Sequence, residues 1–212
     1  GVFSYLFIIW LFFKINIRFV TDSTIRKDRA TWRLINKSYF LEGAKQCLSP
    51  NFSERQGDEV SLLVIHNISL PPGEFGSDNI EKLFTNQLSP EAHPYFEGIS
   101  SLKVSSHLLI NREGLITQFV PFNMAAWHAG VSSFQGLNDC NQFSIGIELE
   151  GTDDIDYTKE QYQSLIEVSK DIMLSFPKIN KENIMGHSDI APERKTDPGP
   201  SFDWHLYLSS LD

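Results

Sequence analysis

The segment Val60-Ser61-Leu62-Leu63-Val64-Ile65-His66 is a short apolar run that ends on a histidine. A run of this kind, with β-branched residues and few polar ones, is typical of a buried central strand of a sheet. His66 is the last residue of the predicted strand, where a side chain is well placed to face a cleft. A core histidine that bonds only to the backbone is the alternative interpretation.

Two further segments predict β-strands. In residues 103–120, the turn-forming sequence Asn111-Arg112-Glu113-Gly114 separates two apolar runs and predicts a hairpin. His107 lies inside the first of these runs, where we expect it to make structural hydrogen bonds. Alternation in Phe143–Gly151 predicts a third strand, with Glu148 on the face opposite its isoleucines. Because an acid in an apolar strand is costly without a partner or a function, Glu148 is a candidate catalytic group; a solvated sheet face is the alternative.

The helical signals are clearest in the second half of the chain. Thr158-Lys159-Glu160-Gln161 is a capping box, which predicts the start of a helix. Apolar side chains follow at helical spacing as far as Phe176, and Pro177 ends the helix, so this stripe is expected to pack on the core. Asn79–Phe84 predicts a short helix, whereas His93–Phe96 is expected to be irregular.

The late segment Met185–Pro200 brings an imidazole, a cation and a carboxylate into one loop-rich stretch. His187 and Asp197 are ten residues apart and are plausible ligands for zinc. A catalytic zinc usually takes three protein ligands and leaves one position for water. His66 is the candidate for the third ligand. Lys195 lies two residues before Asp197, so both side chains can point to one side of an extended segment.

These residues together are suited to the hydrolysis of an amide. Zinc lowers the pKa of a bound water to about 7. A carboxylate such as Glu148 can take the proton and pass it to a leaving amine, and Lys195 can stabilise the oxyanion. Trp127 and His128 are expected in a loop, where an aromatic side chain either forms a pocket wall or packs beneath the loop.

Composition excludes several other classes of protein. The chain has 212 residues and a formal net charge of −9, which argues against binding to nucleic acid. It lacks the G-x-S-x-G elbow of serine hydrolases, the H-E-x-x-H helix of zincins and the glycine-rich motifs of nucleotide-binding proteins. Its two cysteines, Cys47 and Cys140, are expected to be free thiols rather than a disulfide.

The first 39 residues are expected to be an extension outside the domain at residues 40–212. Residues 2–13 are almost wholly apolar, but this run is shorter than the roughly 20 residues that span a bilayer. A non-native or uncharacterised extension is one interpretation, and a membrane or export segment in residues 1–20 is the other. Residues 21–39 are polar and basic, which predicts a solvated linker.

Four segments resemble the type 2 N-acetylmuramoyl-L-alanine amidases, whose superfamily includes the peptidoglycan recognition proteins. These segments are Leu62–Gly76, Ala126–Val131, Phe143–Asp153 and Gly186–Pro200. The similarity runs from about residue 40 to residue 205 and does not reach the N-terminal extension. Long ordered strings of this kind make the resemblance specific.

The resemblance implies an α/β fold with a mixed β-sheet flanked by helices. It implies that His66, His187 and Asp197 bind Zn2+. Glu148 matches the catalytic acid/base of the family, and Lys195 matches the lysine that helps to stabilise the transition state.

The resemblance also suggests substrate contacts. Asn67, Trp127 and Arg194 fall at positions that the family uses around a muropeptide. Some relatives carry arginine where this chain has Lys103 and Asp139, near the peptide end of the substrate. Lys103 keeps the positive charge and Asp139 reverses it, which leaves the preferred peptide stem open.

The implied reaction cleaves the amide between the muramyl lactyl group and L-Ala of cell-wall fragments. Relatives of this kind act as cytoplasmic enzymes on 1,6-anhydro-muropeptides during cell-wall recycling, and we expect a monomer. Two alternatives remain. One is an anchored or periplasmic amidase that acts on intact peptidoglycan, with membrane contact only through residues 1–20. The other is a non-catalytic peptidoglycan-binding protein.

Overall fold

The computed structural model describes residues 35–57 and 59–212. Residues 1–34 of the expected N-terminal extension, which include its apolar segment and most of the predicted linker, therefore lie outside the described residues. Within the described part, Ile35 pairs with Leu41 across a turn and packs against the main core. None of the described helices is long and apolar enough to cross a membrane.

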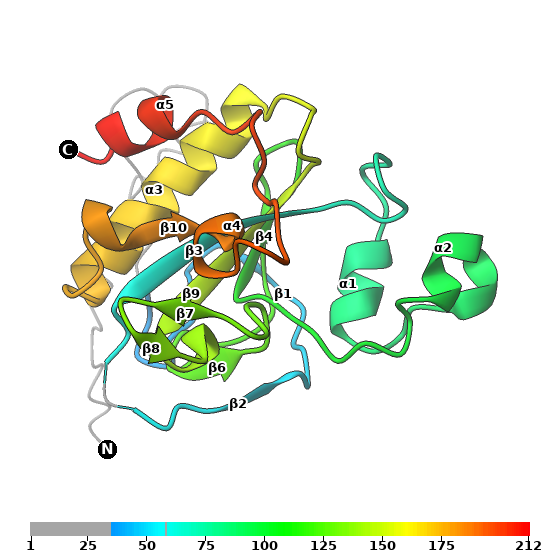
Figure 1. Ribbon diagram of the computed structural model, residues 1–212, viewed down its shortest axis with the longest axis horizontal. Helices are drawn as coiled ribbons and strands as arrows, with labels where there is room; N and C mark the ends of the chain where they lie inside the picture. Colours follow the sequence, from blue (N-terminus) through cyan, green and yellow to red (C-terminus); the bar gives the residue numbers. More distant parts are fainter. Residues whose placement is uncertain (1–34, 58) are drawn as a thin grey trace, which may run out of the picture. The chain divides into compact units, whose positions relative to one another are not determined.

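A six-stranded mixed sheet lies at the centre of the described domain (Figure 1). Its strands, in spatial order, are β1 Lys45–Gln46, β5 Ile116–Gln118, β4 Leu108–Ile110, β9 Ser144–Glu150, β3 Leu62–Ile68 and β10 Ile184–Gly186. Only β4 and β5 pair antiparallel; the other neighbours in this sheet are parallel. Two small antiparallel pairs accompany it: β2 Phe52–Glu54 with β6 Met124–Ala126, and β7 Ser133–Phe134 with β8 Leu137–Asn138.

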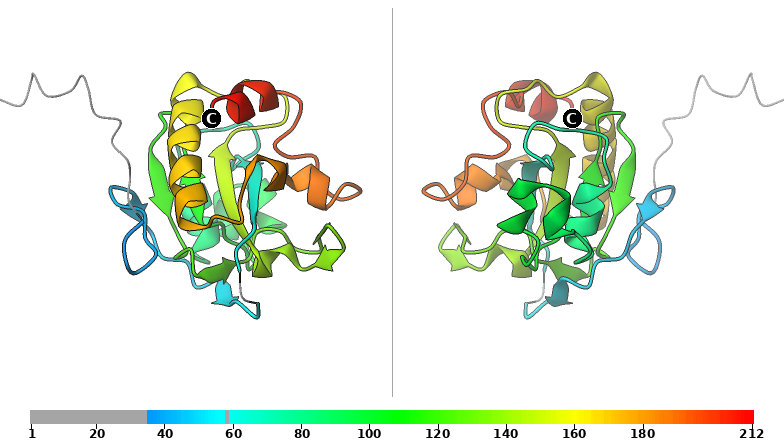
Figure 2. Two further views of the ribbon diagram at one scale, coloured as in Figure 1. Left: turned by 90° about the vertical axis from the view of Figure 1, so that its left-hand side faces the viewer. Right: turned by 90° about the vertical axis from the view of Figure 1, so that its right-hand side faces the viewer.

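Helices cover both faces of the sheet. Figure 2 shows α3 on one side and α1 with α2 on the other. The helices are α1 Asn79–Phe84, α2 Pro94–Glu97, α3 Lys159–Ser175, α4 His187–Ile190 and α5 Trp204–Ser209. Within the described ranges, the connections contain the short 3-10 segments η1 Pro90–Ala92, η2 Cys140–Gln142 and η3 Lys181–Asn183. The expected mixed sheet flanked by helices is confirmed.

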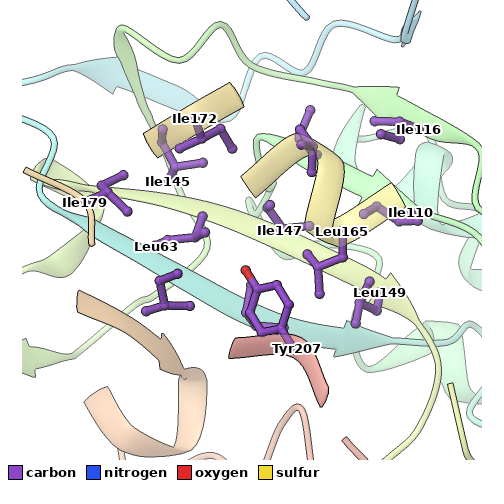
Figure 3. Close-up of a cluster of buried hydrophobic side chains, with 14 of the residues drawn as sticks. Leu63, Ile110, Ile116, Ile145, Ile147, Leu149, Leu165, Ile172, Ile179 and Tyr207 are labelled. Carbon is purple, nitrogen blue, oxygen red and sulfur yellow. The ribbon is translucent and has the colours of Figure 1, made fainter. Parts of the chain in front are cut away.

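The alternation of the strands divides the core into two layers. Leu63 and Ile147 point toward α3, where they pack with Leu165 (Figure 3). Leu109 faces the opposite way and packs with Phe84 of α1. Burying one such aliphatic side chain contributes about 1.5–3 kcal/mol, so both layers hold the central strands in place.

Several local predictions are confirmed. The capping box is formed: Thr158 Oγ1 accepts from the Gln161 backbone N–H at 3.1 Å, and the Gln161 side chain accepts from Thr158 N–H at 3.1 Å. α1 has the predicted bounds. The hairpin is present as β4 and β5, and its Gly114 has the positive φ of 76° that glycine adopts readily. Its strands are shorter than predicted, and His107 lies just before β4, although its N–H still donates to Gly146 O of β9.

Two local predictions were wrong. The first strand starts at Leu62 and continues two residues past His66, because Asn67 and Ile68 still pair with β9. The predicted irregular piece 93–96 instead leads into α2, which begins at Pro94. There the His93 ring accepts from the Tyr95 N–H at 3.1 Å, and Pro94 occupies the first helical position, where its missing N–H costs nothing.

Candidate active site

Sheet register places three predicted site residues side by side. His66 on β3 is the direct neighbour of Glu148 on β9. On the other side of β3, Gly186 of β10 pairs with Ile65, so the next residue, His187, comes level with His66. These positions lie toward the carboxyl ends of parallel strands, where open α/β sheets place their ligands. His187 is the first residue of α4 rather than part of the expected loop, and Figure 1 shows α4 directly after β10.

Asp197 joins the two histidines from the segment after α4. Its backbone carbonyl accepts from the Ser188 N–H at 3.0 Å, which ties this segment to the start of α4. Its Oδ2 lies 3.1 Å from the Nδ1 atoms of both His66 and His187, and those two Nδ1 atoms are 3.0 Å apart. Among the described residues, these three form the group whose ligand atoms are close enough to share a metal ion.

The outer nitrogen of His187 shows which of its ring atoms faces the metal position. His187 Nε2 lies 3.0 Å from the Ala129 carbonyl oxygen, which can only accept a hydrogen bond. A neutral His187 therefore carries its proton on Nε2 and directs the Nδ1 lone pair toward Asp197. Burial lowers the pKa of His66 to about 4, so this ring is neutral at physiological pH. The arrangement is suited to holding a cation.

Glu148 is a buried acid next to this group. Its side chain is 8% exposed, and its Oε2 has no hydrogen-bond partner within the described part of the chain. Burial, reinforced by the nearby charge of Asp197, raises the pKa of Glu148 well above its ordinary value, while the charge of Lys195 acts in the opposite direction. A carboxyl with a raised pKa and a free oxygen is suited to accept and release a proton.

A cleft of about 530 Å³ opens over these residues. Glu148, His187, Lys195 and Asp197 line its polar part. An apolar part extends toward α1 and α2 and is lined by Leu70, Leu83, Phe84, Tyr95, Ile99 and Leu102. The cleft thus combines a charged centre with an apolar wall, as ligand sites commonly do.

The predicted substrate-contact residues are only partly brought together. Trp127 lines the cleft and is 37% exposed, so it forms a pocket wall. Asn67 also lines the cleft, but its amide donates to Asp153 Oδ1 at 2.8 Å and to the Pro198 carbonyl. Arg194 is not among the lining residues. Its guanidinium donates to the Ala129 and Val131 carbonyls at 2.6 and 2.8 Å.

The two positions that depart from some relatives lie away from the cleft lining. The side chains of Lys103 and Asp139 are exposed and contribute nothing to the wall of the described cleft. Asp139 has a positive φ of 56° and precedes the 3-10 segment η2.

The structure adds site residues that sequence reasoning missed or left undecided. Asp153 lines the cleft and holds Asn67. The apolar wall from α1 to Leu102 was missed because nothing in that stretch of sequence indicated a cleft. His107 has the structural role that we expected: its Nδ1 accepts from the Gly146 N–H at 3.0 Å, and its Nε2 donates to Met124 O at 3.0 Å. Both cysteines are free, as predicted.

Comparison with known proteins identifies the family. The family model for N-acetylmuramoyl-L-alanine amidases matches residues 56–200. The chain belongs to this family. The matched range contains the candidate ligands of this amidase together with Glu148 and Lys195.

Relatives of this amidase are similar along most of its length. It is 57% identical over 172 residues to the 1,6-anhydro-N-acetylmuramyl-L-alanine amidase AmpD of Citrobacter freundii. The aligned region covers 81% of this chain and 91% of that protein. A crystal structure of a selenomethionine AmpD derivative superposes with a TM-score of 0.80 at 54% identity and covers 82% of this chain and 98% of that one. The Escherichia coli amidase AmiD, in complex with the substrate anhydro-N-acetylmuramic acid-L-Ala-D-γ-Glu-L-Lys, has a TM-score of 0.53 at 29% identity, covering 74% and 60% of the two chains.

Proposed function

We propose that this amidase cleaves the amide between the lactyl group of 1,6-anhydro-N-acetylmuramic acid and L-Ala in peptidoglycan fragments. The relatives named above support this substrate, because AmpD is named for it and AmiD was solved with an anhydro-muropeptide. The observation that carries the proposal is the convergence of His66, His187 and Asp197 beside the buried Glu148. A protein that only bound peptidoglycan would need neither the three ligands nor the acid.

We infer that the metal is zinc. Two imidazoles and one carboxylate are a common ligand set for catalytic zinc, which keeps a further position open. Tetrahedral bonds of about 2.0–2.1 Å would set the ligand atoms about 3.3 Å apart. The observed separations of 3.0–3.1 Å need only a few tenths of an ångström of adjustment. Bound zinc would polarise the scissile carbonyl and make water a better nucleophile.

Glu148 is assigned the proton transfer. The reaction forms a C–O bond with water, breaks the amide C–N bond and returns a proton to the amine of L-Ala. Glu148 lines the cleft beside the metal position, so its carboxyl can take the proton from water and deliver it to the leaving nitrogen. Its burial gives the carboxyl the higher pKa that a group with both roles requires.

We assign Lys195 and Trp127 to direct interactions with the substrate. Lys195 lines the cleft with Glu148 and Asp197, and its ammonium can stabilise the negative charge that develops on the carbonyl oxygen. Trp127 offers an exposed aromatic face on the cleft wall, which suits packing against a sugar ring or the peptide. Asn67 faces the same cleft and keeps its assignment as a substrate contact.

A cytoplasmic location and a monomeric state remain predictions from the resemblance. Fractionation of the native-length product tests the first, and light scattering tests the second.

The function itself is tested by metal analysis combined with a turnover assay on 1,6-anhydro-muropeptide, with and without a chelator. We expect about one zinc ion per chain and loss of turnover on chelation that zinc restores. Turnover that persists in the metal-free protein would refute the proposal.

A further inference from the structure

The ring of His66 is connected to a buried chain of hydrogen bonds behind the metal position. His66 Nε2 lies 2.9 Å from His128 Nδ1, and His128 Nε2 lies 3.0 Å from Ser144 Oγ. Ser144 Oγ is in turn 2.6 Å from the carbonyl oxygen of Cys140. The side chains of His66, His128 and Ser144 are buried, so solvent does not replace these partners.

The Cys140 carbonyl, at the end of this series of hydrogen bonds, determines where each proton lies. The Cys140 carbonyl can only accept, so the single hydroxyl proton of Ser144 is donated to it. Ser144 Oγ then accepts from His128 Nε2–H, which leaves a lone pair on His128 Nδ1. That lone pair accepts from His66 Nε2–H, and the lone pair of His66 is left on Nδ1, the atom that faces His187 and Asp197.

The surrounding backbone is built around the His128 ring. A Cβ at Gly146 would lie 2.5 Å from His128 Cγ, so this ring packs against β9 only because residue 146 is glycine. Asn141 Oδ1 accepts from the N–H groups of His128 and Ala129 at 3.1 and 2.8 Å, which fixes the backbone that carries the ring. The position of His128 is therefore determined independently of its contact with His66.

We propose that His128 and Ser144 are positioning residues that fix the tautomer of His66, so that His66 presents an unprotonated Nδ1 to the metal. Partners of this kind orient a metal-bound histidine and raise its basicity. The proposal rests on the metal site of the proposed function, but the direction of the hydrogen bonds does not require the metal to be present. Without Ser144, His128 can carry its proton on Nδ1 and donate to His66 Nε2, which would place the His66 proton on the metal-facing atom.

The direct test is the tautomer of each ring in the wild-type chain. Long-range 15N–1H NMR spectra of the metal-free protein distinguish Nδ1–H from Nε2–H histidines. We expect both His66 and His128 to be Nε2–H tautomers. Either ring in the Nδ1–H form would overturn the proposal. This measurement needs neither a variant nor activity, so it remains decisive if the proposed reaction is wrong.

A second test measures zinc affinity by competition with a chelator of known strength. Ser144→Ala and His128→Phe should each weaken zinc binding by about 10–100-fold. Both changes interrupt the same series of hydrogen bonds from Ser144 through His128 to His66. The double variant should therefore bind zinc about as weakly as His128→Phe alone. Ser164→Ala is the matched control, since it also removes a buried hydroxyl that donates to a backbone carbonyl, at 2.6 Å to Gly114 O, and should leave the affinity unchanged. The proposal would be contradicted if Ser144→Ala bound zinc with wild-type affinity. It would also be contradicted if the losses of affinity in the two single variants added fully in the double variant.

Discussion

His107 provides a test of the fold that does not involve the metal. Its ring is buried, and both nitrogens are used in the neutral form: Nδ1 accepts from Gly146 N–H and Nε2 donates to Met124 O. The Arg55 guanidinium lies 3.3 Å from Nε2. Burial, with this positive charge as the second cause, lowers the pKa of His107 from 6.5 to about 3.

The sign of the effect on stability follows from proton uptake. The folded His107 binds a proton less readily than the unfolded one, so its contribution is fully present above pH 6.5. That contribution is lost as the pH falls from 6.5 toward 3, because the unfolded chain then gains a proton that the native state excludes. The loss is about 1.4 kcal/mol per pH unit, or about 2 kcal/mol at pH 5 for this residue alone.

Urea unfolding of the full chain in excess chelator, at pH 8 and at pH 5, measures this loss. His107→Gln keeps an amide that can donate and accept but cannot be charged, so it should be less stable than wild type at pH 8. Its deficit should shrink by about 2 kcal/mol at pH 5. His205→Gln, at an exposed position, is the control and should follow the wild-type pH dependence. An unchanged deficit for His107→Gln between the two pH values would refute a buried neutral His107.

Three further predictions concern the site. Glu148→Gln should retain zinc but lower kcat by about 10²–10⁴-fold, because the amide cannot transfer the proton; unchanged kcat at full metal content would remove its assigned role. His187→Ala should lose both zinc and turnover, and stoichiometric zinc by elemental analysis would contradict its assignment as a ligand. Gly146→Ala should destabilise the protein by about 1–3 kcal/mol in urea unfolding, since its Cβ would meet the His128 ring; wild-type stability would show that the ring can move aside.

The features predictable from sequence were those that one segment specifies by itself. The capping box at Thr158 and the apolar stripe after it determine α3 locally. The alternation around Glu148 determines both the strand β9 and the face to which the acid points. The end of β3 was misplaced because it depends on pairing with Leu149 and Glu150 of another strand, which the sequence of β3 does not contain.

Other features depend on contacts between distant segments, so residue types alone could not give them. The strand sequences alone left open a core histidine for His66 and a solvated acid for Glu148. The register of β3, β9 and β10, which no single strand sequence contains, places both residues beside His187, and Glu148 is buried there. The resemblance alone suggested Arg194, which follows α4, as a substrate contact, and this stays a prediction. Its actual partners, Ala129 and Val131, come from a loop more than sixty residues earlier.

The two carboxylates of the site show how the fold assigns different roles to one chemical group. Burial acts on both Asp197 and Glu148 and favours the protonated form of each. At Asp197 the contacts with His187 and His66 outweigh burial, and its pKa lies below the usual range. At Glu148 no such contact exists among the described residues, and the charge of Asp197 adds to the effect of burial. A carboxylate that binds a metal must stay ionised, whereas one that carries a proton must be able to gain and lose it. The opposite pKa shifts therefore suit Asp197 to the role of metal ligand and Glu148 to the role of acid/base.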